Sequence, residues 1–185
     1  MKNNMQSMKK EIENCIKNIP DFPKEGIQFK DITPLFKNID LFDKYITYYA
    51  TQLKNKNITK IVCVDARGFI FGTALAMKLG LPFVLARKQG KLPDKTLVST
   101  YNLEYGTSTL EMHVADINDN DNVLIVDDLL ATGGTVEAVS KLVQNLGGKI
   151  HGYFFLIELT FLEGKVKLTN VCKNDNINFY TLIKY

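Results

Sequence analysis

The sequence has few cysteines, no long apolar run and little net charge, and each shortage argues against a class of protein. Its three cysteines, Cys15, Cys63 and Cys172, include no Cys-x-x-Cys pair, which argues against a disulfide framework or a zinc site and favours a reducing compartment. No apolar run approaches the ~18 residues of a membrane span, and residues 1–20 lack the apolar stretch of a signal peptide. The net charge of +3 is too small for a long nucleic-acid footprint. We therefore expect a cytoplasmic protein that binds neither membrane nor nucleic acid.

The length of 185 residues favours one domain, and no internal repeat or low-complexity linker divides the chain. Apolar residues at helical spacing predict helices over residues 8–18 and 40–54. Short continuous apolar runs follow at 61–64, 82–86, 123–126 and 150–157, and helical stretches are predicted at 69–79 and 135–146. Such runs alternating with helices are typical of parallel strands covered on both faces.

The predicted fold is therefore α/β, with an open, mainly parallel twisted sheet flanked by helices. Residues 97–112 lack a long apolar run and are rich in Thr, Ser, Tyr and Gly, which is typical of an antiparallel excursion or a mobile loop. In an open sheet of this kind, ligands bind beyond the carboxyl ends of the strands.

The most informative segment is residues 123–135, where a buried strand ends in Asp127 and Asp128 before a turn and a helix. The turn, Ala131-Thr-Gly-Gly-Thr135, suits a phosphate because small residues let backbone N–H groups approach an anion and the helix N-terminus adds partial positive charge. The two carboxylates can accept hydrogen bonds from vicinal hydroxyls. A phosphate cradle beside two acceptors matches ribose 5-phosphate, whereas the absence of a P-loop lysine and of Gly-x-Gly-x-x-Gly argues against triphosphate and dinucleotide sites.

This string resembles the phosphoribosyl pyrophosphate signature of the type I phosphoribosyltransferases. The resemblance implies that Asp127 and Asp128 hold the 2′- and 3′-hydroxyls of the ribose. It further implies that the 5′-phosphate is bound by the turn residues Ala131, Thr132, Gly133, Gly134 and Thr135.

Two basic motifs resemble the pyrophosphate-binding loops of adenine phosphoribosyltransferases. They are Asp65-Ala-Arg-Gly-Phe69 and Arg87-Lys-Gln-Gly-Lys-Leu-Pro93. By residue type alone, an arginine such as the one in the first motif is more often a surface or salt-bridged residue, and the second motif is more typical of a solvated basic turn. Gln89 departs from the Pro, Lys or Arg that the family commonly has there, and the family often has a cis peptide bond in the first loop. The residues implied in pyrophosphate binding are Arg67, Arg87, Lys88 and Lys91.

Two further segments resemble the parts of the family that close over the base. Tyr101-Asn-Leu-Glu-Tyr-Gly106 is similar to the flexible catalytic loop, here residues 95–113, which implies catalytic roles for Glu104 and Tyr105. Residues 19–34 are similar to the N-terminal hood, here residues 1–34. There the backbone around Gln28 and Lys30 would bind the edge of adenine while Phe29 packs on its ring.

The resemblance covers residues 20–164 and implies an enzyme of purine salvage. Such an enzyme transfers the 5-phosphoribosyl group of phosphoribosyl pyrophosphate to N9 of adenine, giving AMP and pyrophosphate. It implies Mg²⁺ held mainly by substrate and water, with no metal site built from protein side chains alone, and a homodimer. The alternatives left open are a phosphoribosyltransferase for hypoxanthine–guanine, xanthine or orotate, and a non-catalytic regulator that senses phosphoribosyl pyrophosphate.

Overall fold

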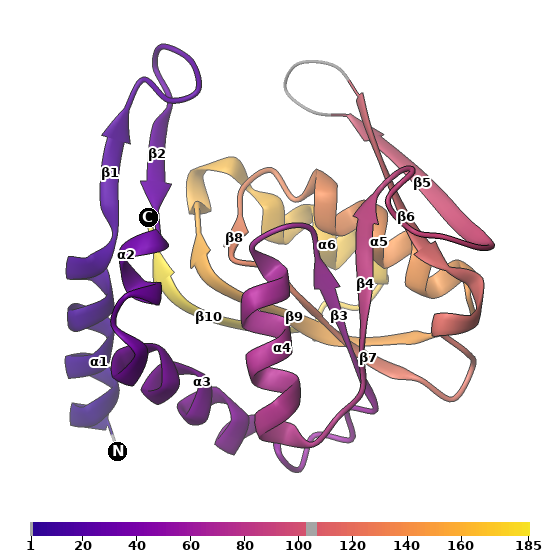
Figure 1. The fold of residues 1–185 in the computed structure, drawn as a ribbon, viewed down its shortest axis with the longest axis horizontal. Helices are drawn as coiled ribbons and strands as arrows, with labels where there is room; N and C mark the ends of the chain where they lie inside the picture. Colours follow the sequence, from indigo (N-terminus) through magenta and orange to yellow (C-terminus); the bar gives the residue numbers. More distant parts are fainter. Residues whose placement is uncertain (1, 103–106) are drawn as a thin grey trace. The chain divides into compact units, whose positions relative to one another are not determined.

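A computed structural model describes residues 2–102 and 107–185, which pack as two compact units, residues 1–51 and residues 52–185. The first unit holds two longer helices, a short one and a two-stranded hairpin (Figure 1). Its elements are α1 (Lys2–Cys15), β1 (Lys17–Pro20), β2 (Gln28–Asp31), α2 (Thr33–Phe36) and α3 (Ile39–Leu53), of which α3 ends just inside the second unit.

The first helix is shorter at its C-terminal end than the sequence predicts. Helix α1 ends at Cys15, and residues 17–20 form strand β1, which pairs antiparallel with β2. The prediction of a helix to residue 18 is therefore wrong. Helical spacing of Ile12, Ile16 and Ile19 could not reveal this strand, because its ladder depends on a partner strand further along the chain.

The second unit is built on an eight-stranded sheet with strand order β10-β9-β7-β3-β4-β6-β5, and β8 pairs with β9 off this path. Strands β10, β9, β7, β3 and β4 run parallel, whereas β6 is antiparallel to both β4 and β5. The strand bounds are β3 Lys60–Val64, β4 Phe83–Lys88, β5 Thr96–Asn102, β6 Thr107–His113, β7 Asn122–Val126, β8 Leu129–Leu130, β9 Lys149–Glu158 and β10 Asn178–Lys184.

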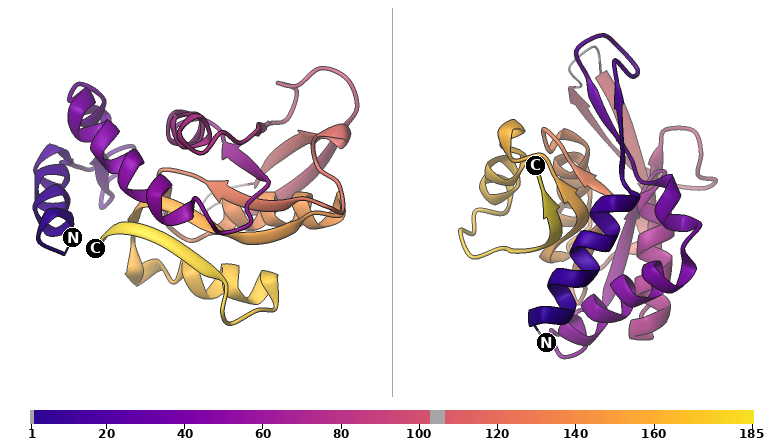
Figure 2. Two further views of the ribbon diagram at one scale, coloured as in Figure 1. Left: turned by 90° about the horizontal axis from the view of Figure 1, so that it is seen from below. Right: turned by 90° about the vertical axis from the view of Figure 1, so that its left-hand side faces the viewer.

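Helices cover both faces of this sheet: α4 lies on one face, and α5 and α6 lie on the other (Figures 1 and 2). Their bounds are α4 Gly68–Leu79, α5 Gly134–Asn145 and α6 Gly164–Cys172, with 3₁₀ turns at Val114–Asp116 and Thr160–Leu162. The two covered faces account for the continuous apolar runs, because every residue of β3 from Ile61 to Val64 is buried. Cys63 lies against Gly72 of α4, where an added Cβ would clash with its sulfur.

The predicted fold class, an open and mainly parallel α/β sheet flanked by helices, is confirmed. On either side of residues 103–106 the described chain forms the antiparallel excursion that the sequence predicts within residues 97–112, since β5 and β6 pair from Thr96–His113 to Asn102–Thr107. The sequence did not predict β8, α6 or β10. Among the described residues, no helix is long and apolar enough to span a bilayer.

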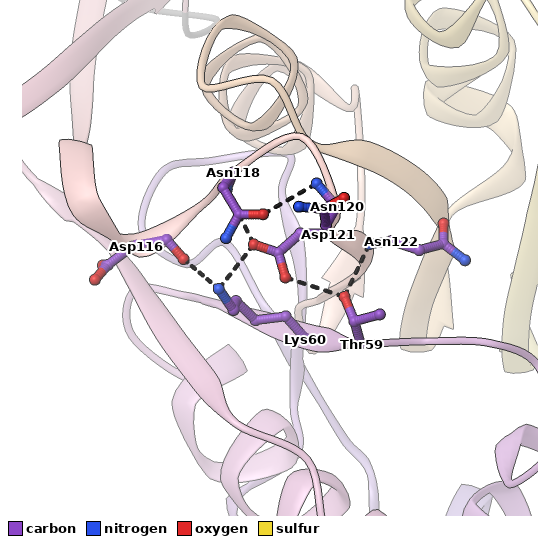
Figure 3. A network of polar contacts seen from close by, with 7 residues as sticks. All are labelled: Thr59, Lys60, Asp116, Asn118, Asn120, Asp121 and Asn122. Carbon is purple, nitrogen blue, oxygen red and sulfur yellow. Dashed lines mark hydrogen bonds and ion pairs between the residues drawn. The ribbon is translucent and has the colours of Figure 1, made fainter.

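A polar network joins β3 and β7 at their amino ends (Figure 3). Asp121, just before β7, accepts hydrogen bonds from the Lys60 ammonium at 2.8 Å and the Thr59 hydroxyl at 3.1 Å. The Asn118 N–H donates to the same carboxylate at 3.0 Å, and Lys60 also donates to the Asp116 carbonyl at 2.6 Å. Burial raises the pKa of Asp121, but these donors outweigh it and lower the pKa overall. At this edge of the sheet, the buried Asp121 carboxylate therefore has hydrogen-bond donors from the chain itself.

Candidate functional site

The opposite, carboxyl edge of the sheet contains a topological switch between β3 and its neighbour β7. The chain leaves β3 into α4 on one face and leaves β7 toward α5 on the other (Figure 2). The two connections diverge, which is the geometry that creates a ligand crevice in an open α/β sheet. The loops after β3, β4 and β7 carry most of the site residues that the sequence predicts.

Asp127 and Asp128 lie directly after β7, at this switch. The Asp128 side chain is 6% exposed and accepts a hydrogen bond from Arg67 Nε at 2.6 Å. Asp127 uses one carboxylate oxygen to accept the backbone N–H of Asp128 at 2.9 Å. Burial raises the pKa of Asp127 well above its usual range, and the adjacent charge of Asp128 raises it further. The surroundings therefore compensate the charge of Asp127 poorly, and a ligand with hydroxyl donors would stabilise its ionised form.

The Asp65–Gly68 loop after β3 lies directly against these aspartates. The peptide bond between Asp65 and Ala66 is cis, which agrees with the feature that the family resemblance implies. Gly68 opens α4 so close to β7 that an added Cβ would be 2.6 Å from the Val126 carbonyl oxygen and 3.1 Å from an Asp127 carboxylate oxygen. Only glycine allows this approach, which sets the Arg67 side chain beside Asp128.

The predicted phosphate turn, residues 131–135, connects β8 to α5. Gly133 caps α5 with a φ of 80°, a left-handed conformation that favours glycine. The first turn of α5 leaves backbone N–H groups without partners inside the helix, as an anion requires. Gly164, the first residue of α6, packs behind the turn, because a Cβ on it would clash with the Ala131 carbonyl oxygen and lie 3.0 Å from the Gly133 nitrogen.

The basic segment, residues 87–93, leaves the end of β4 and is held against β6. Arg87 Nε lies 3.5 Å from an Asp65 carboxylate oxygen, and its guanidinium donates to the Lys91 carbonyl at 3.1 Å. The Arg87 guanidinium carbon also lies 5.9 Å from the centre of the Phe69 ring. Lys88 and Lys91 are exposed, so their charges are accessible to a ligand.

The structure thus brings the predicted ribose, phosphate and pyrophosphate residues to the loops at one edge of the second unit. Two other groups of predicted residues fall outside the described part of this unit. Gln28, Phe29 and Lys30 form most of β2 in the first unit, where the rings of Phe22 and Phe29 meet edge to face at 5.1 Å. Glu104 and Tyr105 lie outside the described residues.

Three residues at the site were not assigned a role from the sequence. Asp65 contacts Arg87 and so links the loops after β3 and β4. Gly164 backs the phosphate turn, and Glu111 of β6 binds the basic segment. Each of these contacts joins residues that are distant in sequence. The spacing of residues along the chain therefore could not reveal the role, even where the residue lies inside a recognised motif.

Comparison with known proteins identifies relatives along nearly the whole chain. Residues 33–169 match the phosphoribosyl transferase domain. The chain is 49% identical over 174 residues to the adenine phosphoribosyltransferase of Haemophilus ducreyi, covering 94% of this chain and 95% of the relative. It superposes on the crystal structure of adenine phosphoribosyltransferase from Thermoanaerobacter pseudethanolicus with a TM-score of 0.88 and 48% identity, covering 96% and 99% of the two chains. The enzyme of Saccharomyces cerevisiae, solved with an imino-altritol bisphosphate and adenine, has a TM-score of 0.87 and 39% identity, with 96% and 99% covered.

Proposed function

The chain belongs to the adenine phosphoribosyltransferases, enzymes of purine salvage within the phosphoribosyltransferase family, and on that premise we propose a role for each part of its site. The reaction transfers the 5-phosphoribosyl group of phosphoribosyl pyrophosphate to N9 of adenine, giving AMP and pyrophosphate. The observation that carries the site assignment is the paired Asp127 and Asp128 directly before the glycine turn of α5.

Asp127 and Asp128 accept hydrogen bonds from the 2′- and 3′-hydroxyls of the ribose. The raised pKa of Asp127 supports this role, because hydroxyl donors stabilise a carboxylate that the fold leaves poorly compensated. The 5′-phosphate binds the N-terminal turn of α5 through Ala131, Thr132, Gly133, Gly134 and Thr135. The support for that role is the left-handed Gly133 and the free first turn of the helix.

Arg67, Arg87, Lys88 and Lys91 bind the pyrophosphate. Two of these cations lie beside carboxylates, since Arg67 contacts Asp128 and Arg87 lies near Asp65. Such contacts fix the direction of each guanidinium before substrate arrives, which lowers the entropy lost on binding. The exposed Lys88 and Lys91 add positive charge to the same segment as Arg87.

Adenine N9 attacks the anomeric carbon as the bond to pyrophosphate breaks, through a transition state with positive charge on the ribose ring. The carboxylates of Asp127 and Asp128 stabilise that charge, and the basic side chains stabilise the departing anion. Mg²⁺ is part of the substrate, held by its oxygen atoms and by water, and contributes further positive charge to the leaving group. The residues present fit such a complex, because Asp127 and Asp128 are carboxylates, which would also accept hydrogen bonds from the water that a hard cation carries.

Residues 1–34 act as the hood and residues 95–113 as the closing loop of a single phosphoribosyltransferase domain. The β2 backbone around Gln28 and Lys30 binds the adenine edge, and Phe29 packs on the ring. Glu104 and Tyr105 lie in the connection between β5 and β6, and Glu104 assists proton movement at the purine while the loop excludes water. These roles rest on the motif resemblance and on the position of their segments in the chain.

The enzyme works as a cytoplasmic homodimer. An apolar face on α4 supports self-association, because Ile70 and Met77 are 43% and 78% exposed and lie seven residues apart on one side of the helix. The cytoplasmic location is supported by the three free cysteines. Met77→Glu should convert a dimer into a monomer in sedimentation velocity, whereas an unchanged sedimentation coefficient would contradict this interface.

The assignment is tested by steady-state assays with phosphoribosyl pyrophosphate, Mg²⁺ and each of five bases. AMP should form from adenine, with no product from hypoxanthine, guanine, xanthine or orotate. Thr132→Val should raise KM for phosphoribosyl pyrophosphate about 10-fold by removing one phosphate donor, with KM for adenine unchanged. Phe29→Ala should raise KM for adenine alone, and its ring neighbour Phe22→Ala is the matched control. A Thr132 variant with unaltered KM would remove the phosphate role from the turn.

A further inference from the structure

We infer that Glu111 of β6 is a positioning residue for pyrophosphate binding, which it supports by fixing the backbone of the basic segment, residues 87–93. The inference rests on the pyrophosphate role proposed above for that segment. Glu111 is 3% exposed, lies opposite Arg87 in the β4–β6 ladder and belongs to none of the proposed ligand-binding groups.

The Glu111 carboxylate holds the turn of the basic segment directly. One of its oxygens accepts the backbone N–H groups of Lys91 at 2.8 Å and Leu92 at 2.9 Å. The other oxygen accepts the Thr96 hydroxyl at 3.2 Å, which ties the same carboxylate to the start of β5. Burial raises the pKa of Glu111, but these bonds outweigh it and lower the pKa overall, so the group is ionised at neutral pH.

Hydrogen bonds hold both the N–H and the carbonyl of the Lys91 main chain. Its N–H donates to Glu111, and its carbonyl accepts from the Arg87 guanidinium at 3.1 Å. Gly90, immediately before it, has a φ of 80° and makes the tight turn that these bonds hold. The direction of the Lys91 side chain therefore depends on Glu111, although Glu111 itself points at the backbone.

Two more contacts from β6 reinforce the same segment. The Gln89 N–H donates to the Thr109 carbonyl at 3.0 Å, and a His113 ring nitrogen lies 2.7 Å from the Pro93 carbonyl oxygen. Three residues of strand β6 therefore contact the basic segment. Among the described residues of the strand, Glu111 is the one that does so through a carboxylate. A displacement of about 1 Å in a substrate-orienting group can cost up to about 100-fold in rate, so a small shift of the basic segment is enough to impair the enzyme.

Two substitutions of similar size separate hydrogen bonding from packing. Glu111→Gln keeps an oxygen that accepts both N–H groups, and its amide can donate to Thr96. Glu111→Met fills the same space but leaves those N–H groups unsatisfied. We expect Glu111→Met to raise KM for phosphoribosyl pyrophosphate about 10-fold with kcat within about 3-fold, and Glu111→Gln to stay within about 3-fold of wild type in both.

Asp121→Asn provides the structural control, because Asp121 is another buried acid with a lowered pKa that accepts backbone and threonine donors, at the opposite edge of the sheet. It should lower Tm without raising KM. If Glu111→Met also lowers Tm while leaving KM unchanged, Glu111 is only structural and the inference is wrong.

Lys91→Ala distinguishes failure of the inference from failure of the pyrophosphate assignment. It retains the backbone N–H, so it should raise KM for phosphoribosyl pyrophosphate, and adding Glu111→Met should raise KM by less than about 2-fold more. Fully additive effects would contradict positioning through Lys91. A Lys91→Ala enzyme with normal KM would instead overturn the pyrophosphate role of Lys91, whatever Glu111 does.

Discussion

The two ends of strand β7 carry aspartates in opposite electrostatic states. Asp121, before the strand, is surrounded by the donors of Lys60, Thr59 and Asn118, and its pKa is lowered. The pKa of Asp127, after the strand, is raised well above its usual value by burial and by the charge of Asp128. The 5 residues of β7 are all that separates the two environments along the chain.

The two acids therefore serve different purposes. Asp121 stabilises the fold, whereas Asp127 lowers folding stability and is retained for its proposed role in ligand binding. At the amino edge the Asp121 carboxylate finds its partners within the chain, so that network is complete without a ligand (Figure 3). At the carboxyl edge the Arg67 contact compensates Asp128, while Asp127 receives the Asp128 N–H and remains poorly compensated. Strain of this kind concentrates where a ligand completes the network.

The largest expected effect is on catalysis at Asp128. Asp128→Asn keeps the shape but removes the charge that orients Arg67 and stabilises the ribose cation. The value of kcat/KM should fall about 100- to 1,000-fold, equivalent to about 3–4 kcal/mol. Steady-state kinetics with adenine and phosphoribosyl pyrophosphate measure it, and a loss below about 10-fold would contradict the assignment.

The second effect is on stability at Asp121. Asp121→Asn removes a buried charge held 2.8 Å from Lys60, which should lower the free energy of unfolding by about 2–3 kcal/mol. Guanidinium chloride unfolding measures the loss, and kcat/KM at moderate temperature should stay within about 3-fold of wild type. Lys141→Met, which breaks an exposed pair with Glu137, should cost less than about 0.5 kcal/mol. Equal losses in the two variants would show that the amino-edge network is no stronger than a surface pair.

The third effect concerns the glycine behind the phosphate turn. Gly164→Ala should push the turn outward and raise KM for phosphoribosyl pyrophosphate about 10-fold, because its Cβ would meet the Ala131 carbonyl oxygen. Gly152→Ala is the matched control, since its Cβ would lie 2.5 Å from the Asn178 carbonyl oxygen, on strands β9 and β10. Both variants should lose stability, and a similar KM in both would remove Gly164 from the site.

The sequence predicted most of the second unit because its central strands are buried on both faces. Continuous apolar runs such as residues 61–64 and 123–126 are typical of strands that helices cover on each side, and the glycine turn after Asp128 carries its own chemistry. The short strands escaped prediction. Strand β8 has two residues, and β1 is exposed along its length, so neither has an apolar period to detect.

The site was predictable where its residues are contiguous and unpredictable where they meet only in space. Asp127 and Asp128 follow each other, whereas Glu111 reaches Lys91 across 20 residues of sequence. The opposite pKa shifts of Asp121 and Asp127 could not be inferred either, because the two acids flank the same apolar run. Burial and donor placement decide these shifts, and both are tertiary properties.

The smallest effect, on the stability of Asp127 variants, gives the most direct test. A raised native pKa means that the Asp127 contribution is intact below about pH 3.9, the usual unfolded value, and is lost as pH rises through the native pKa. Asn does not ionise, so Asp127→Asn should become increasingly more stable than wild type from about pH 4 to 8. The lowered pKa of Asp121 has the opposite consequence, since its contribution is present above about pH 3.9 and is lost as pH falls through the native pKa.

The deciding measurement is the free energy of unfolding of wild type, Asp127→Asn and Asp121→Asn across about pH 4–8. As pH rises across this range, Asp127→Asn should gain stability relative to wild type, whereas Asp121→Asn should stay less stable by a nearly constant amount, because the Asp121 contribution is already complete above about pH 3.9. A difference of about 1 kcal/mol would appear as about 2–4 °C in Tm. Asp127→Asn should also bind phosphoribosyl pyrophosphate more weakly despite its greater stability. An Asp127→Asn protein that grows less stable than wild type with rising pH would show that Asp127 is a satisfied structural acid and would contradict the contrast between the two ends of β7.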